Sequence, residues 1–432
     1  MEYEYPLYSK KRIQKAGKAL RKNENNNDDL EVFNNWRSSH AMPLDIISGE
    51  LSSAVNDIDN ENLIVKRLKR APSIINKLKL QPTMSLASMQ DIGGCRTIVS
   101  NIDNVYKISD KIKHKLLSHS LVCTTDYIQN PKSSGYRSMH HVYKFNGEGI
   151  SDKHSGLLIE IQIRTINQHY WATAVETMGT YLKQSLKSSQ GDREYLDLFS
   201  KVGDLIAFYE NSSLYHKGSI LRLLKETRVK IQLLKIFDKL IAFREVTSII
   251  ESEFKDEESP DYYLVITDSD KKTIRVQSVT KENLRSANVT YTKLEQRFQN
   301  SASKDVVLVS AKNLDELREA YPNYFNDINN FFDLFNTVSD YIFNNVTEDE
   351  KIAYESEQKK LSKHFLKKRL RTVRSRHRFA HRSLRMLMRE YKKTKDINKK
   401  KKLNKIIQKN RKSLIELTKS LALIKEYSSK YL

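Results

Sequence analysis

Apolar and polar residues alternate strictly from Ile159 to Arg164, in the order Ile-Glu-Ile-Gln-Ile-Arg. A period of two is typical of a β-strand with one face toward a core and the other toward an open space. The second face of this strand carries an acid, an amide and a guanidinium group, on Glu160, Gln162 and Arg164. Because burying such a row in an apolar core is costly, it is expected to line a polar site. The chain must therefore contain a sheet built beside this site.

Weaker patterns on either side predict the rest of this domain. We expect four strands and a helix: strands over 95–99, 121–128, 141–145 and 157–164, and a helix over 105–117. Glycines and a proline separate them, which predicts an α/β (α+β) domain with a mixed, five-stranded type of sheet flanked by helices. The basic stretch 66–80 has amphipathic spacing, and Pro72 fits the first turn of a helix that begins near Ala71.

Changes of pattern divide the 432 residues into four regions. These are a helical lead-in over 1–60, the site-bearing domain over 61–215, a second, smaller α/β domain over 216–350, and a basic helical extension over 351–432. The second domain is expected to open with a helix over 220–251. The extension contains neither Gly nor Pro, and its apolar residues recur at helical spacing. It is expected to form two helices with a break within 392–402.

The net positive charge of the chain lies entirely in this extension. Residues 351–432 hold 28 Lys+Arg and 6 Asp+Glu, whereas the first 350 residues hold 47 of each. Such a density of cations predicts contact with a polyanion, RNA first of all. Two other interpretations are open: the charge could be a solvated helix face, or it could lie on an acidic membrane surface.

The cysteine count and the lack of long apolar runs limit the class of protein. Cys95 and Cys123 are the only cysteines, which excludes a disulfide framework and a four-cysteine zinc site. No run of about 18 apolar residues predicts a transmembrane helix, and the N-terminus has no apolar signal segment. We therefore expect a cytoplasmic location.

Two carboxylates and several cations have the chemistry of a phosphate-transfer site. Asp91 precedes a Gly-Gly turn into a strand, and Glu160 begins the polar strand face. Carboxylate oxygens suit Mg²⁺, which usually also bridges to substrate phosphates. Nearby cations could neutralise a triphosphate: Arg67, Lys69, Lys77 and Arg96. Taken singly, Asp91 is more often a turn or cap residue, and the cations more often form a solvated helix face.

The order and spacing of these residues resemble the synthetase domain of RelA/SpoT homologues, the (p)ppGpp synthetase family. The similar pieces cover roughly a third of the chain. They are Arg67-x-Lys69-x3-Ser73-x3-Lys77, Asp91-x4-Arg96, Asp126-Tyr127-Ile128, Lys132-x2-Gly135-Tyr136-x-Ser138-x-His140, Glu160-x-Gln162-x-Arg164-Thr165 and Trp171-Ala172.

The resemblance implies transfer of the β,γ-pyrophosphate of ATP to a ribose 3′-hydroxyl, with release of AMP. It implies Asp91 and Glu160 as catalytic residues and Mg²⁺ ligands, with Glu160 also a candidate to activate the hydroxyl. It implies contacts to ATP from Arg67, Lys69, Ser73, Lys77 and Arg96, and contacts to the acceptor from Lys132, Tyr136, His140 and Gln162. Small members that use guanine usually have Asn nine residues after the catalytic Glu. This chain has His169 there, which is a further candidate contact to the acceptor, and the difference from Asn leaves recognition of the acceptor base open.

Parts of the second domain resemble the C-terminal domain of fused toxin–antitoxin members of this family. The similar pieces are Asp261-Tyr262-Tyr263, Tyr291-x2-Leu294-Glu295, 306–311 and Ala320-Tyr321-Pro322-Asn323-Tyr324-Phe325. In that anti-phage subgroup this domain restrains the synthetase until a phage protein binds, and the acceptor is thought to be the 3′-CCA end of tRNA. The resemblance thus predicts a translation-inhibiting tRNA pyrophosphokinase. Alternatives are (p)ppGpp synthesis from GDP or GTP, and a catalytically idle RNA-binding protein.

Overall fold

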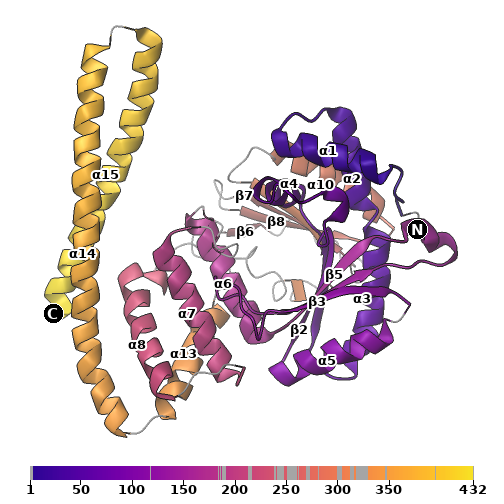
Figure 1. Ribbon diagram of the computed structural model, residues 1–432, viewed down its shortest axis with the longest axis horizontal. Helices are drawn as coiled ribbons and strands as arrows, with labels where there is room; N and C mark the ends of the chain where they lie inside the picture. Colours follow the sequence, from indigo (N-terminus) through magenta and orange to yellow (C-terminus); the bar gives the residue numbers. More distant parts are fainter. Residues whose placement is uncertain are drawn as a thin grey trace. The chain divides into compact units, whose positions relative to one another are not determined.

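The computed structural model divides the chain into two compact units, Met1–Leu214 with Asp238–Val338, and Tyr215–Phe237 with Ser339–Leu432 (Figure 1). We refer to them as the first and the second unit. The structure describes residues 3–116, 118–182, 184, 186, 191–212, 217–237, 240, 248–250, 260, 262–268, 273–280, 282–298, 304–311, 316–317, 329–345, 348–394 and 396–431.

The first unit opens with three helices, α1 (Lys10–Lys22), α2 (Asn27–Ser38) and α3 (Ala41–Asn56). Local side chains fix where the first two begin: Ser9 accepts a hydrogen bond from the backbone of Arg12, and Asn26 forms a capping box with Asp29. The apolar faces of α1 and α2 pack on α4 (Ala71–Leu80), which carries Pro72 in its first turn as predicted.

A five-stranded mixed sheet follows, which confirms the predicted fold class. The strands are β1 (Leu63–Leu68), β2 (Gly93–Val99), β3 (Ser120–Asp126), β4 (Met139–Lys144) and β5 (Leu158–Thr165). Their order is β1-β2-β5-β4-β3, and β2 and β5 run parallel while the other neighbours run antiparallel. The remaining elements are η1 (Leu86–Ser88), α5 (Ile102–Lys115), η2 (Gly149–His154), α6 (Ile166–Leu182) and α7 (Arg193–Tyr209).

The two faces of β5 serve different purposes, as its alternation predicts. Ile159, Ile161 and Ile163 are fully buried in a core to which α3 and α5 contribute their apolar faces. The opposite face of β5 carries Glu160 and Gln162, which are paired in register with Gly94 and Arg96 of β2. The sheet therefore separates an apolar core from a polar surface.

Two local features differ from the predictions. The first residues of the stretch 66–80 belong to β1, which ends at Leu68 and was not predicted, whereas the helix begins at Ala71 as expected. The helix expected over 220–251 ends earlier: α8 covers Lys217–Leu234, and β6 occupies Ser248–Ile250. Lys235, directly after α8, has a left-handed backbone (φ 49°), a conformation that cannot continue a right-handed helix.

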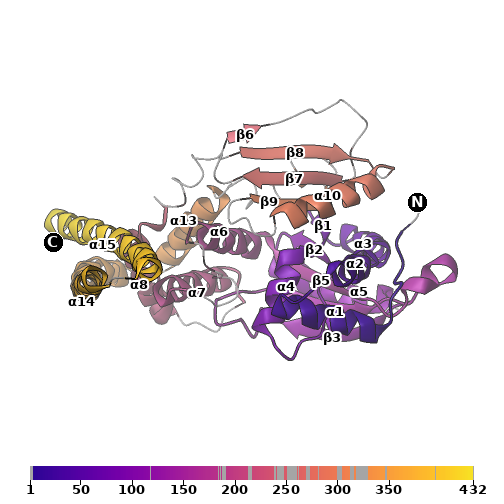
Figure 2. The same cartoon turned by 90° about the horizontal axis from the view of Figure 1, so that it is seen from above.

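A second sheet belongs to the same unit and lies over β1 and β2 (Figure 2). Its strands are β6, β7 (Tyr262–Asp268), β8 (Thr273–Val279) and β9 (Lys304–Ser310), in the order β6-β8-β7-β9, and α10 (Leu284–Phe298) packs on one face. The other face buries an apolar cluster shared with the first sheet, to which β1 gives Leu63 and Val65 and β2 gives Ile98. Of the pieces that carry the toxin–antitoxin resemblance, Asp261 and 320–325 lie outside the described residues.

The second unit contains α8 and a long helical hairpin. The hairpin consists of α14 (Glu348–Lys393) and α15 (Ile397–Tyr431), and its turn falls within the predicted break (Figure 1). Val373 and Leu370 pack with Leu417, Leu421 and Leu233 of α8. Helix α13 (Asn329–Asn344) spans the boundary between the units. No helix among the described residues has the length and apolar character needed to cross a bilayer.

Candidate active site

The polar face of the first sheet collects the predicted site residues from four strands. Strand registers place these residues on one face: Arg67 of β1, Arg96 of β2, His140 of β4, and Glu160, Gln162 and Arg164 of β5. The register alone brings them together, because the side-chain period of each strand is two and the pairings are continuous. Residues separated by almost a hundred positions therefore share one surface.

Asp91 lies where the chain enters β2 and binds two of the predicted phosphate-binding cations. Its Oδ2 accepts hydrogen bonds from Lys69 Nζ and Lys77 Nζ, both at 2.8 Å. The three side chains are partly buried, with 16% of Asp91, 26% of Lys69 and 28% of Lys77 exposed. Burial would raise the pKa of Asp91, but the two ammonium charges outweigh it and lower the pKa. The carboxylate is therefore ionised and available as a ligand.

Glu160 is held by its neighbours on the same face. Its Oε1 lies 3.0 Å from His140 Nδ1, and its Oε2 accepts a 2.6 Å hydrogen bond from Gln162. Burial and the nearby charge of Asp91 raise the pKa of Glu160, whereas the hydrogen bond and charge of His140 lower it. The net effect is a lowered pKa. The Glu160 carboxylate is therefore ionised, which is the form that can bind a metal ion or accept a proton.

The two carboxylates are electrostatically coupled, because the charge of Asp91 raises the pKa of Glu160 and the charges of both act on Lys132. Burial lowers the pKa of Lys132, and the charges of Glu160 and Asp91 oppose that effect. The other Asp91 oxygen, Oδ1, is buried without a hydrogen-bond partner among the described residues. An unsatisfied buried carboxylate oxygen is suited to bind a cation. The described residues contain no cluster of three or more metal-binding side chains, so Mg²⁺ here would depend on two carboxylates and on substrate oxygens.

The predicted acceptor side is an aromatic cluster in which Tyr136 is only 3% exposed. The Tyr136 hydroxyl hydrogen-bonds to His140 Nε2 at 2.9 Å, and the ring contacts Tyr127 and Trp171. Lys132 Nζ lies 4.5 Å from the centre of the Tyr127 ring and 5.1 Å from that of Tyr136. Tyr127 is the less buried of the two tyrosines, and sequence reasoning gave it no role although it follows Asp126 in a recognised motif.

Arg164 and His169 form a buried pair beside this cluster. The Arg164 guanidinium contacts His169 Nδ1, and the two residues are 2% and 1% exposed. Burial and the charge of Arg96 lower the pKa of Arg164 to about 9. Two further Arg164 nitrogens, Nε and Nη1, are buried without a partner among the described residues. These donors favour an anion at this end of the face, a role that the sequence analysis did not assign to Arg164.

Glu210, at the end of α7, is a further residue that the sequence did not reveal. Its carboxylate accepts hydrogen bonds from Thr165, Asn167 and Gln168, at the junction of β5 and α6. Burial raises the pKa of Glu210 to about 7. Glu210 thus positions the end of the strand that carries Glu160.

The N-terminus of α4 is the last part of the site, and it carries Ser73 in its first turn. The N-cap residue Arg70 supplies no side-chain cap. Instead, Glu295 of α10 accepts a 3.0 Å hydrogen bond from the backbone of Ala71. The same carboxylate forms a 2.8 Å ion pair with Arg37, in which the side chains are 5% and 4% exposed. The N-terminus of a helix favours anions, so Glu295 lies where a phosphate group would be stabilised.

Comparisons with known proteins match the part of the chain that contains these residues. A family model described as a region found in RelA / SpoT proteins matches residues 66–185. The GTP pyrophosphokinase YwaC of Bacillus subtilis is 32% identical over 162 residues, which cover 34% of this chain and 76% of that protein. The GTP pyrophosphokinase YjbM of the same organism is 34% identical over 113 residues, covering 26% of this chain and 52% of that protein.

Solved structures give similar matches. The crystal structure of the small alarmone synthetase 2 from Bacillus subtilis matches with 24% identity and a TM-score of 0.34, over 40% of this chain and 90% of that chain. The small alarmone synthetase 1 from Bacillus subtilis, bound to its product pppGpp, matches with 24% identity and a TM-score of 0.29, over 34% of this chain and 73% of that chain.

Proposed function

The chain belongs to the RelA/SpoT family of pyrophosphokinases, and we propose that it transfers the β,γ-pyrophosphate of ATP to the ribose 3′-hydroxyl at the 3′-CCA end of tRNA. The observation that carries the proposal is the electrostatic coupling of Asp91 and Glu160, with Lys69 and Lys77 bound to Asp91 and Lys132 influenced by both carboxylates. Transfer of phosphoryl groups depends mainly on cations around the phosphates and on a positioned acceptor, and this site offers the cations.

The residues divide the reaction between them. Arg67 and Arg96 would flank the adenine, and Lys69, Ser73 and Lys77 would hold the phosphates. The acceptor 3′-oxygen forms a bond to the β-phosphorus, the bond from that phosphorus to the α,β-bridging oxygen breaks, and AMP leaves with that oxygen. The hydroxyl proton passes to Glu160 or to water. Mg²⁺, held by Asp91 and Glu160, would neutralise charge on the transferred group.

The two lysines on Asp91 suggest how the site is prepared for ATP. In the structure they neutralise the carboxylate at 2.8 Å. A triphosphate offers them more negative charge, and their transfer to it would leave both Asp91 oxygens available to Mg²⁺. Lysine suits this exchange because its ammonium group is a mobile point charge on a flexible stem.

One observation favours tRNA over a guanine nucleotide as acceptor. His169 stands where members that use guanine usually have Asn, and here it is buried in a contact with Arg164. The burial of Tyr136 among its aromatic neighbours does not discriminate, because it opposes the predicted stacking on the base of either acceptor. The names of the relatives support the alternative, synthesis of (p)ppGpp from GDP or GTP, which would use the same catalytic residues.

We further propose that the second sheet and α10 restrain the enzyme, as the toxin–antitoxin resemblance implies. Glu295 occupies the anion-binding end of α4, and Arg37 anchors it there together with Tyr291, whose hydroxyl lies 2.6 Å from the guanidinium. The second sheet packs beside Arg67 on the face that would receive the adenine. A phage protein that binds this domain and draws α10 away would free the site. The expected outcome is inhibition of translation.

A labelling experiment tests the acceptor. The purified chain is incubated with γ-labelled ATP and either deacylated tRNA or a mixture of GDP and GTP. We expect label in tRNA, removed by ribonuclease, and AMP released in equal amount. Label found in guanine nucleotides alone would establish the alternative. Absence of transfer in either mixture, together with unchanged cellular effects of the Glu160→Gln variant, would support a catalytically idle RNA-binding protein.

A further inference from the structure

A straight row of arginines follows the outer side of α14. The six residues Arg371, Arg374, Arg378, Arg382, Arg385 and Arg389 are all exposed. Their spacings are all three or four residues, which matches the 3.6-residue turn of an α-helix and places them in one stripe of about 27 Å. We call this stripe the arginine ridge.

The ridge faces away from the apolar contact of the hairpin. On α14, Val373 and Ala380 are each 9% exposed and lie on the side opposite the ridge. On α15, the buried residues Leu403 and Ile407 lie one turn apart on one face of that helix. The apolar residues of the hairpin are thus used to hold its two helices together. What remains outside is a rigid helix face that presents guanidinium groups.

Acidic residues are missing from the sequence around the ridge. Residues 358–389 contain no Asp or Glu, and neither do residues 397–415 of α15. Surface charges that merely keep a helix soluble are normally interspersed with the opposite sign. A stripe of one sign over five turns creates a strong local field, and such a field attracts a polyanion.

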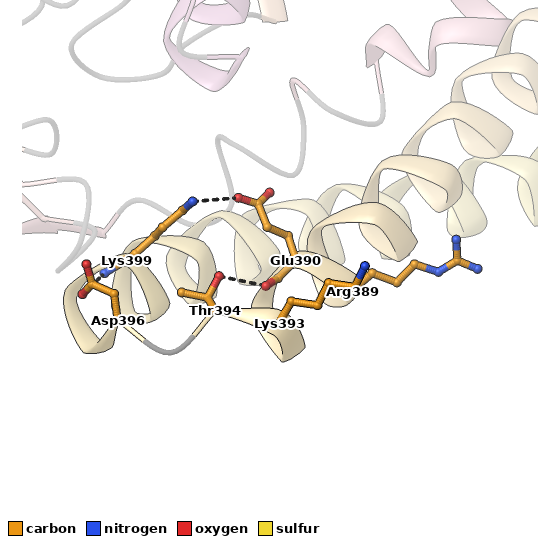
Figure 3. Close-up of a pocket in the computed structure, with 6 residues that line it drawn as sticks. All are labelled: Arg389, Glu390, Lys393, Thr394, Asp396 and Lys399. Atoms are coloured by element: carbon orange, nitrogen blue, oxygen red, sulfur yellow. Dashed lines mark hydrogen bonds and ion pairs between the residues drawn. The ribbon is translucent and has the colours of Figure 1, made fainter.

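The next acids along the chain lie at the turn of the hairpin. An open hollow there is lined by Arg389, Glu390, Lys393, Thr394, Asp396 and Lys399 (Figure 3). There Glu390 forms a 3.4 Å ion pair with Lys399. The Arg389 side chain extends away from this pair (Figure 3). Glu390 is therefore paired with a lysine of α15 rather than with an arginine of the ridge.

We propose that the arginine ridge binds the phosphate backbone of RNA. Guanidinium groups bind phosphate with two parallel hydrogen bonds, and all six positions are Arg rather than Lys. Phe379 and Met386 border the ridge and are 76% and 66% exposed. An exposed aromatic ring between cations is suited to stacking on an unpaired base. This proposal goes beyond the proposed catalytic function and does not depend on it. Only the preference for RNA over DNA rests on the proposal that tRNA is the acceptor.

An acidic membrane surface fits the ridge less well than RNA. A helix that lies in a membrane interface needs a continuous apolar face, and the apolar face of α14 is used against α15. The exposed apolar residues on the outer side are separated by arginines. Binding to anionic vesicles is therefore an outcome that the test must be able to detect.

The test measures binding of the full-length chain to a tRNA transcript by fluorescence anisotropy, without ATP and in the Glu160→Gln background. Binding is then independent of the proposed reaction. Changing Arg374, Arg378, Arg382 and Arg385 to Gln should weaken binding at least tenfold at about 0.15 M salt and reduce the slope of log K against log salt by about 3. The matched control changes Lys401, Lys402, Lys405 and Lys409 of α15 to Gln, which removes the same charge, and its effect should be smaller.

Two further variants separate charge from geometry. Replacing the same four arginines by Lys should keep most of the salt slope but weaken binding, and Phe379→Ala should weaken binding to an unpaired oligonucleotide about tenfold. Unchanged affinity and slope in the Gln variant, or an equal loss in the α15 control, would overturn the proposal. So would equal or tighter binding to duplex DNA, or vesicle binding that the ridge variant abolishes while tRNA binding persists.

Discussion

The contact of Glu295 with Arg37 and α4 offers the sharpest test of the proposed restraint. Glu295→Ala removes one side of an ion pair in which both side chains are at most 5% exposed, together with the cap on Ala71. Loss of one partner of a buried pair costs about 3–5 kcal/mol, because the other charge remains buried and unpaired. The variant should therefore destabilise the docked position of α10.

The size of the effect on ATP follows from this cost. Taking the lower value, about 3 kcal/mol shifts the balance between docked and released α10 by roughly 100-fold, since about 1.4 kcal/mol is a factor of ten. If only the released form binds ATP, the apparent Kd equals the Kd of the released form divided by the fraction of molecules in that form. Glu295→Ala should then lower the apparent Kd for ATP by up to about 100-fold. Calorimetric titration with a non-hydrolysable ATP analogue measures this without any acceptor.

Two variants make the measurement specific. Glu295→Gln keeps the shape and can still accept the bond from Ala71, so it should have an intermediate effect. Tyr262→Phe removes the 3.2 Å contacts of the Tyr262 hydroxyl with Asp45, which also join the second sheet to α3 but lie apart from α4. Its Kd for ATP should change little. An unchanged or higher Kd in a folded Glu295→Ala protein would refute the restraint by α10.

Three further outcomes follow from the site. Glu160→Gln should reduce transfer by at least about a thousandfold while the melting temperature stays the same, as measured by AMP release and thermal denaturation. Lys77→Ala should raise the KM for ATP more than tenfold, whereas the exposed neighbour Lys79→Ala should not. Because the pKa of Glu210 rises to about 7 on folding, the folded state binds the extra proton, and its free energy of unfolding should fall by about 1–3 kcal/mol between pH 4.5 and pH 7. Glu210→Gln, which resembles the neutral acid, should flatten that slope in urea titrations; an unaltered slope would contradict it.

Strand β5 could be predicted because its two faces meet different surroundings, an apolar core and a polar cleft. Strand β1 could not, because both of its faces are packed. Leu63 and Val65 contact the second sheet, while Ile64 and Leu68 pack on the core of the first. A strand buried on both faces has no alternation to detect. The sequence therefore predicts no strand here, although Arg67 stands out by its chemistry.

The residues that the sequence did not reveal are those whose partners lie far away along the chain. Arg37 and Glu295 are separated by 258 positions, and Glu210 lies 45 positions from Thr165. Such pairs leave no local pattern, since neither residue differs from an ordinary surface charge until the fold brings them together. The site residues themselves were accessible to sequence reasoning because each belongs to a short motif.

The apolar cluster shared by the two sheets limits how this enzyme can be switched. Separating the entire second sheet from the first would expose Leu63, Val65 and Ile98 to water. This apolar contact is therefore expected to be permanent. The contact of α10 with Arg37 and with the start of α4 is polar and involves only Glu295 and Tyr291, so a competing surface can break it. A chain that ends before the second sheet would expose this apolar cluster, so it is expected to aggregate rather than to be an active enzyme. Activation is therefore better sought by releasing one helix than by removing a domain.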